Sequence, residues 1–162
     1  MDFTSSRPED LLFNAARQGD ATTITALVQQ GTNVNAQDSR GFTPLVLAAY
    51  DNQAEAVQAL LQAGANPNLR DAAGNTALMG VAFKGYADIA RLLIDNGADL
   101  NARNGNGSTA LMFATLFGRH DMLASLLQAG ADTTVRDENG LSARDLAVQK
   151  GNHTALEHLP QE

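Results

Sequence analysis

The chain contains no cysteine and no tryptophan, and aromatic residues make up only 5% of its 162 residues. Without cysteine the protein has no disulfide bond, no thiolate zinc site and no cysteine nucleophile. A hydrophobic share of 44% with so few large rings favours thin layers of small side chains, as in closely packed helices. The length suits one ordinary domain.

The sequence also lacks a long apolar run and an excess of basic residues. No stretch approaches the length of a membrane span, and residues 1–7 have neither the basic region nor the apolar segment of a secretory signal. We therefore expect a cytoplasmic protein. The formal net charge of −7 opposes binding to nucleic acids and to anionic membranes. A protein partner with a basic or an apolar face fits better.

What the sequence does contain is a repeat of 33 residues. In one series, each glycine is followed two residues later by threonine or serine. This series is Gly41, Gly74, Gly107 and Gly140. A second series follows pairs of aliphatic residues, at Gly31, Gly64, Gly97 and Gly130. Two independent series with one period predict a solenoid of similar stacked units.

Each unit has the pattern of a turn followed by two short helices. The first helix is expected to begin after a capping hydroxyl, at Thr43, Thr76, Thr109 and Ser142. Pro44 suits the first position of such a helix. Ile89, Leu92 and Leu93 have the helical spacing that gives the second helix one buried face. Asn52 stands where other units have a helix-ending glycine, and asparagine tolerates the left-handed backbone.

These segments resemble the ankyrin repeat family. The resemblance lies in Asp-Ser-Arg-Gly-Phe-Thr-Pro-Leu (38–45), Asn-Thr-Ala-Leu-Met (75–79), Ser-Thr-Ala-Leu-Met (108–112) and Gly-Ala-Asp (97–99 and 130–132). It covers nearly the whole chain. It implies an all-α ankyrin-repeat solenoid of about five stacked helix-turn-helix units joined by hairpin-like loops, in a single domain of residues 1–162. The small size and the absence of cysteine and of an appended domain resemble a stand-alone bacterial ankyrin protein.

The unit boundaries implied by the resemblance are 5–37, 38–70, 71–103, 104–136 and 137–162. The first and last units depart from the family pattern, with Asp-Leu-Leu-Phe at 10–13 and with Arg144 in place of a core leucine. Polar terminal units are expected as caps, because one of their faces lies in water. Val46, Met79 and Met112 replace the usual histidine of the family, and we expect an apolar contact there.

The resemblance implies that partners bind along a concave groove formed by the first helices and the loop tips. Tyr50, Phe83, Leu116 and Phe117 would form an apolar band along it. Another interpretation is that these side chains lean onto neighbouring repeats and only seal the groove. The candidate partner-binding residues are Arg17, Arg40, Phe42, Tyr50, Asp51, Asn75, Phe83, Lys84, Leu116, Phe117 and Lys150.

A second periodic series consists of Arg70, Arg103 and Arg136. These arginines could form a strip that binds phosphates or carboxylates. The structural interpretation, which the net negative charge supports, is that they form exposed pairs beside acidic neighbours and set the geometry of the loops.

We find no catalytic or metal-binding arrangement of residues. His153 and His158 are five positions apart and do not share a helical face, so they make a poor metal pair. The glycines recur as turn and cap residues and form no phosphate-binding loop. We therefore expect no enzyme activity, no cofactor and no metal.

The function expected from the sequence is a non-catalytic, monomeric module that binds another protein through its groove. Two alternatives stay open: a structural protein that associates with itself through the apolar band, and an inhibitor or immunity-type protein that blocks an enzyme. The identity of the partner is beyond the sequence, because repeat scaffolds bind unrelated partners through variable residues.

Overall fold

The structure is a computed structural model that describes residues 7–161. Two expectations touch residues outside this range: the absence of a secretory signal at the start of the chain, and the first residues of the unit 5–37. Within the described range the chain forms helices only, and they follow one another in pairs. They are α1 (Pro8–Gln18), α2 (Ala21–Gln29), α3 (Pro44–Tyr50), α4 (Ala54–Gln62), α5 (Ala77–Lys84), α6 (Ala87–Asp95), α7 (Ala110–Leu116), α8 (His120–Gln128), α9 (Ala143–Lys150) and α10 (His153–His158).

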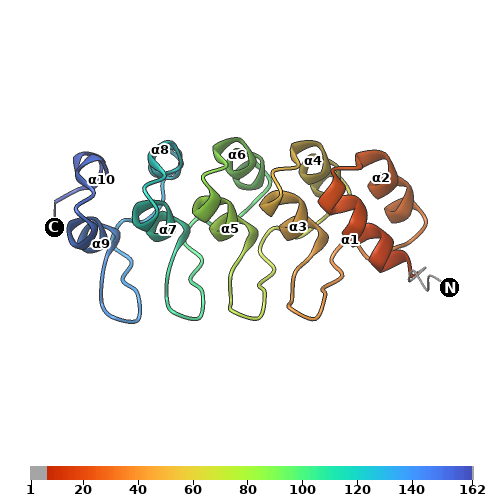
Figure 1. Ribbon diagram of the computed structural model, residues 1–162, viewed down its shortest axis with the longest axis horizontal. Helices are drawn as coiled ribbons and strands as arrows, with labels where there is room; N and C mark the ends of the chain where they lie inside the picture. Colours follow the sequence, from red (N-terminus) through yellow and green to blue (C-terminus); the bar gives the residue numbers. More distant parts are fainter. Residues whose placement is uncertain (1–6, 162) are drawn as a thin grey trace.

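The helices form two parallel layers, and the loops form a third row (Figure 1). The first helices of the pairs contact one another in chain order, and these are α1, α3, α5, α7 and α9. The second helices do the same, and these are α2, α4, α6, α8 and α10. The loops project from the side of the first helices that lies away from the second helices (Figure 1). This arrangement confirms the predicted all-α solenoid.

The first helices begin at the predicted hydroxyl residues, with one exception in the capping. The Thr43 and Thr109 side chains accept hydrogen bonds from the backbone N–H groups of Val46 and Met112. Ser142 forms a full capping box with Asp145. Thr76 precedes α5 but makes no side-chain cap bond, so the prediction was wrong for this residue.

The core is thin and rich in alanine and leucine, as expected for closely stacked helices. Met79 and Met112 are buried and Val46 is half-buried, which confirms the apolar contact expected in place of histidine. Ala49, Ala82 and Thr115, near the ends of the first helices of the middle units, are buried, but Val148, at the equivalent position of α9, is 60% exposed. This side chain is open to solvent because no helix pair packs beyond α9 and α10 in the described chain.

Successive loops are joined by backbone hydrogen bonds. The N–H of Ala72 donates to Arg40 O at 3.0 Å, and equivalent bonds join the later loops. A Cβ atom on Gly41 would lie 2.9 Å from the backbone of Asp71 and Ala72, so glycine lets these loops approach. Asn52 has φ of 58°, which confirms its predicted left-handed backbone.

The periodic arginines tie the loops together. Arg103 donates to Gly107 O at 3.3 Å and to Arg136 O, in the next unit, at 2.8 Å. Arg70 bonds in the same way to Gly74 O and Arg103 O. The structural interpretation is therefore supported, but the partners of these two arginines are backbone carbonyls, where neighbouring acidic side chains were expected. Arg136 does reach a carboxylate, that of Asp145, which lies nine positions away at 3.1 Å.

In the last unit, the polar residue Arg144 of α9 contacts the segment that follows α10. Arg144, which replaces a core leucine, donates a hydrogen bond to Leu159 O at 3.1 Å. Arg144 thus satisfies a carbonyl after α10, where a leucine would bury apolar surface.

Candidate partner-binding groove

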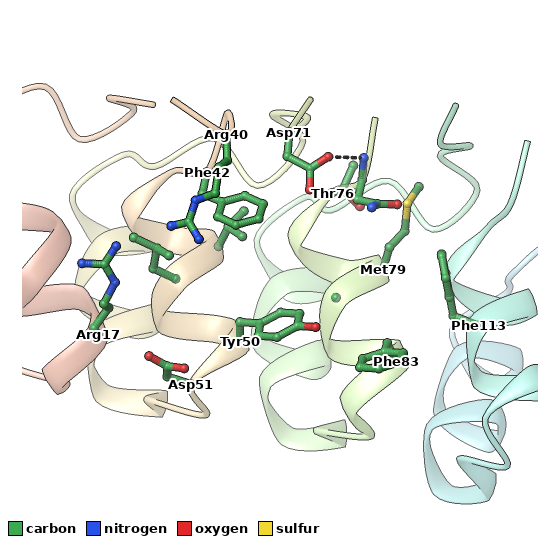
Figure 2. Close-up of a pocket in the computed structure, with 14 residues that line it drawn as sticks. Arg17, Arg40, Phe42, Tyr50, Asp51, Asp71, Thr76, Met79, Phe83 and Phe113 are labelled. Carbon is green, nitrogen blue, oxygen red and sulfur yellow. Dashed lines mark hydrogen bonds between the residues drawn. The ribbon is translucent and has the colours of Figure 1, made fainter. Parts of the chain in front are cut away.

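We call the surface formed by the first helices and the loops the groove face. It contains a cavity of about 520 Å³ between α3 and α5. Figure 2 shows the residues that line it. The cavity brings together candidate residues from three units, namely Arg17, Arg40, Phe42, Tyr50, Asp51, Asn75 and Phe83.

Four aromatic rings follow one another along the groove face, and we call Tyr50, Phe83, Phe113 and Phe117 the aromatic band. The rings of Tyr50 and Phe83 are stacked, with centroids 6.5 Å apart, and those of Phe83 and Phe117 meet edge to face at 4.6 Å. Phe113 stacks on Phe117 at 6.4 Å. Tyr50 is nevertheless 40% exposed and Phe117 is 47% exposed. The rings therefore contact one another and still present apolar surface to solvent.

A glycine inside α5 lines the cavity. Gly80 occupies the position that holds Leu47 in α3, Phe113 in α7 and Leu146 in α9. A Cβ atom at Gly80 would lie 3.1 Å from Cδ2 of Tyr50. Figure 2 shows the Tyr50 ring pointing from α3 toward α5. Because Gly80 has no side chain, the Tyr50 ring can lie against α5 and takes up space that a side chain fills in the other units.

The threonine at the start of α5 also lines this cavity. Thr76 is only 4% exposed, and its hydroxyl oxygen is the one buried side-chain polar atom of residues 7–161 without a hydrogen-bond partner. Thr109, its counterpart at α7, uses the same oxygen as a helix cap. The wall of the cavity therefore contains a helix start that is less well satisfied than its neighbour.

The junction between α3 and α5 lacks a link that other junctions have. Gln53 donates to Arg17 O at 2.9 Å, and Arg119 donates to Phe83 O at 2.9 Å, each joining its unit to the preceding one. The equivalent residue between α5 and α6 is Tyr86, for which no such hydrogen bond is found in the described chain. The units around the cavity are held by their loops and by packing.

Cations lie over two of the rings at the cavity. The Arg40 guanidinium is 4.5 Å from the Phe42 ring centroid and forms a 2.8 Å salt bridge with Asp38. Burial alone would raise the pKa of the Asp38 carboxyl, but hydrogen bonds from the Arg40 side chain and from the Phe42 and Arg40 backbones outweigh it and lower that pKa. The Lys84 ammonium is 4.7 Å from the Tyr50 ring centroid.

Asp71 and Asn75, which also line the cavity, form hydrogen bonds that hold the loops. The Asp71 carboxylate accepts 2.9 Å hydrogen bonds from the backbone N–H groups of Ala73 and Asn75. The Asn75 side chain accepts a hydrogen bond from Asn104 in the next loop at 2.9 Å. These polar groups hold the rim of the cavity in place.

The other candidate residues lie outside the cavity. Leu116 is half-buried against the core, and Phe117 lies just beyond α7. Lys150 is exposed at the end of α9. Sequence reasoning missed several cavity residues, namely Val46, Leu47, Asp71, Thr76, Met79, Gly80 and Phe113. A comparison of the repeats at the position of Gly80 could have revealed the cavity, since Gly80 is the only glycine there.

Among residues 7–161, no group of three or more histidine, aspartate or glutamate side chains is placed to hold a metal ion. None of the described helices is both long enough and apolar enough to cross a bilayer.

Comparison with known families identifies the repeat. A family model described as "Ankyrin repeats (3 copies)" matches residues 12–104, and a model described as "Ankyrin repeats (many copies)" matches residues 93–147. None of the curated proteins compared with the chain gives a significant match. The first model alone covers 93 of the 162 residues, so the chain belongs to the ankyrin repeat family. Ankyrin repeats are generally protein–protein interaction modules and are typically non-catalytic.

Proposed function

We propose that this protein is a non-catalytic module that binds another protein on its groove face. The observation that carries the proposal is the aromatic band, in which Tyr50 and Phe117 stay exposed although the rings contact one another. Rings that only sealed the junctions between repeats would be buried as fully as Leu47, which is 8% exposed, whereas Tyr50 is 40% exposed. The exposed rings of Tyr50 and Phe117, joined by the half-buried rings of Phe83 and Phe113, leave apolar surface in water, which is typical of a surface that a partner covers.

The residues around the band support this proposal. Lys84 and Arg40 each lie over an aromatic ring of the groove face. Aromatic side chains and arginine are the residues in which binding hot spots are enriched. The proposed interface therefore combines apolar anchors at its centre with charged groups at its rim.

We also propose that the protein acts as a monomer in the cytoplasm. Sedimentation over a range of protein concentrations tests the oligomeric state. A single monomeric species at all concentrations is expected, and a concentration-dependent dimer would favour self-association through the aromatic band instead. An inhibitor role differs from an adaptor role only in the identity of the protein that is bound.

The binding surface is tested by affinity capture from the native cell extract. The double variant Tyr50→Ala/Phe83→Ala is expected to lose the proteins that the unaltered chain retains, because it removes two anchors of the aromatic band. Val148→Ala is the matched control, since it removes exposed apolar surface at the end of the solenoid. Equal capture by all three chains would contradict the proposed site. A large loss of folding stability in the double variant would show that the two rings are core residues.

A further inference from the structure

We propose that the junction between the second unit (α3 and α4) and the third unit (α5 and α6) is a hinge. It opens at the turns between the two helices of a unit and stays closed at the loops. The inference goes beyond the proposed function, because it concerns the free chain and requires no partner. It stands on a hydrogen bond that one edge of the junction lacks, on the bonds along the other edge, and on the contacts between α3 and α5.

The turns between paired helices form the first edge, which we call the free edge. At other junctions a side chain at this turn bonds to a carbonyl of the preceding unit, as described above for Gln53 and Arg119. Asn152 does the same and donates to Thr115 O at 2.9 Å. The equivalent residue of the third unit is Tyr86, which packs half-buried against the core. No hydrogen bond among the described residues joins its side chain to α3, so this junction alone of the four lacks the link.

The connections from each second helix to the next first helix form the other edge, which we call the bonded edge. The Asn68 side chain accepts a hydrogen bond from the Asp99 N–H at 2.7 Å and donates one to Gly97 O at 3.0 Å. The backbone bond between the loops and the bond from Arg70, both described above, lie on the same edge. Two bodies that are bonded along one edge only can rotate about that edge.

The contacts between α3 and α5 leave room for this rotation. A cavity of about 520 Å³ lies between the two helices, so their packing is incomplete. Near the free edge the Tyr50 ring contacts Phe83 and Lys84, and it is 40% exposed. Ring contacts occur over a broad range of geometries, whereas a hydrogen bond weakens steeply as its angle departs from linearity. Rotation about the bonded edge therefore changes the spacing of Tyr50 and Phe83 within the aromatic band.

The test measures distances between two spin labels on the full chain by pulsed electron spin resonance. Because the chain contains no cysteine, introduced cysteines are the only labelled positions. Thr22→Cys/Asp88→Cys places labels on exposed positions in the first turns of α2 and α6, beside the free edge. Gln29→Cys/Asp95→Cys is the matched control, with labels at the exposed last positions of the same two helices. The distance distribution of the first pair is expected to be broader than that of the control.

Supplying the missing link should narrow the broad distribution. Tyr86→Arg introduces the side chain that Arg119 provides at the next junction, and it should reduce the width for the first pair to that of the control. Tyr86→Leu keeps an apolar side chain without a donor and should leave the width unchanged. Denaturant unfolding of both variants checks that they keep a cooperative transition.

Removing a link elsewhere tests the same cause in a chain that keeps Tyr86. Arg119→Ala deletes the bond to Phe83 O between the third and fourth units. It should broaden the distribution for Asp88→Cys/Thr154→Cys, whose labels lie on either side of that junction.

Three results would overturn the inference. Equal widths for the pairs at the two edges would show that the junction does not rotate about the bonded edge. An unchanged broad distribution in a folded Tyr86→Arg variant would show that the missing bond is not the cause. An unchanged distribution in Arg119→Ala would show that bonds of this kind do not hold the junctions.

Discussion

Helices α5 and α7 both begin with Ala-Leu-Met, and both stack between neighbouring first helices, yet their exposed sides differ. Helix α7 is preceded by Thr109, whose side chain caps it, and Phe113 of α7 lies on the groove face. Helix α5 is preceded by Thr76, whose side chain makes no cap bond, and it has Gly80 at the position equivalent to Phe113. The cavity lies beside α5, and Phe113 forms its far wall.

The difference shows that adjacent units can share the residues that build the core and still differ in the residues that face the groove. Leucine and methionine residues that face the core are the same in both helices and build the solenoid. The residues that face the groove are free to vary, because no neighbouring helix fixes their size. A cost in local stability at α5 is therefore tolerated and leaves a recess next to the aromatic band.

The largest expected effect tests what the two helices share. Leu78→Ala in α5 and Leu111→Ala in α7 remove side chains that are both buried at equivalent positions. Each is expected to lower the free energy of unfolding by about 2–5 kcal/mol, measured by denaturant unfolding. A loss of less than about 1 kcal/mol for Leu78→Ala alone would show that the core around α5 is not packed like that around α7.

The next effect tests the caps. Thr109→Ala removes a cap bond and should lower the free energy of unfolding by about 1 kcal/mol. Thr76→Ala loses the same methyl and hydroxyl groups but no cap bond, so its loss should be clearly smaller. The difference between the two variants in the same unfolding experiment isolates the cap. Equal losses would mean that Thr76 caps α5 in solution.

A smaller effect, of opposite sign, tests the cost of the cavity. Gly80→Ala should raise the free energy of unfolding by about 0.5–1 kcal/mol, because alanine favours the helix more than glycine does. The added Cβ lies 3.1 Å from the exposed Tyr50 ring, which has room to shift by the few tenths of an ångström needed. A destabilised Gly80→Ala variant in thermal or denaturant unfolding would show that the ring is held rigidly and that glycine is required for packing.

The smallest effect is on the pH dependence of stability, and it concerns the capping box of α9, which α5 and α7 lack. The pKa of the Asp145 carboxyl is lowered, mainly by a hydrogen bond from the Ser142 backbone N–H. Slight burial opposes this shift, and the Ser142 hydroxyl and the Arg136 guanidinium add to it. A lowered pKa stabilises the fold above the ordinary carboxyl pKa, and this contribution is lost as the pH falls through the folded-state value. Asp145→Asn should therefore show a shallower loss of stability in acid. Unchanged acid dependence in unfolding curves recorded over a pH series would contradict this assignment.

The sequence was sufficient to predict the scaffold, because its determinants recur with one period. Glycine turns, hydroxyl caps and leucine pairs each appear in every middle unit, so an error in one unit is corrected by the others. Thr76 shows the limit of this reasoning, since a residue type suited to capping makes no cap bond in this unit. Whether a hydroxyl reaches an N–H depends on distances within one helix start, which the repeat pattern does not contain.

The site was predicted only in part, for a related reason. Large groove-face residues such as the exposed Tyr50 and the half-buried Phe83 could be found by their position in the repeat. The cavity is lined in part by Gly80, which has no side chain to draw attention, and its far wall comes from Phe113 in the next unit. A search for prominent side chains overlooks a recess, although a comparison of the repeats at the position of Gly80 would have shown it.

The claim that the groove face binds the partner is tested most directly by amide hydrogen exchange of the full chain, alone and with the captured protein. The account predicts slower exchange in the complex at α3, α5 and α7 and in the loops that precede them, with α4, α6 and α8 unchanged. Slower exchange confined to α4, α6 and α8 would contradict it, because those helices form the opposite layer of the solenoid.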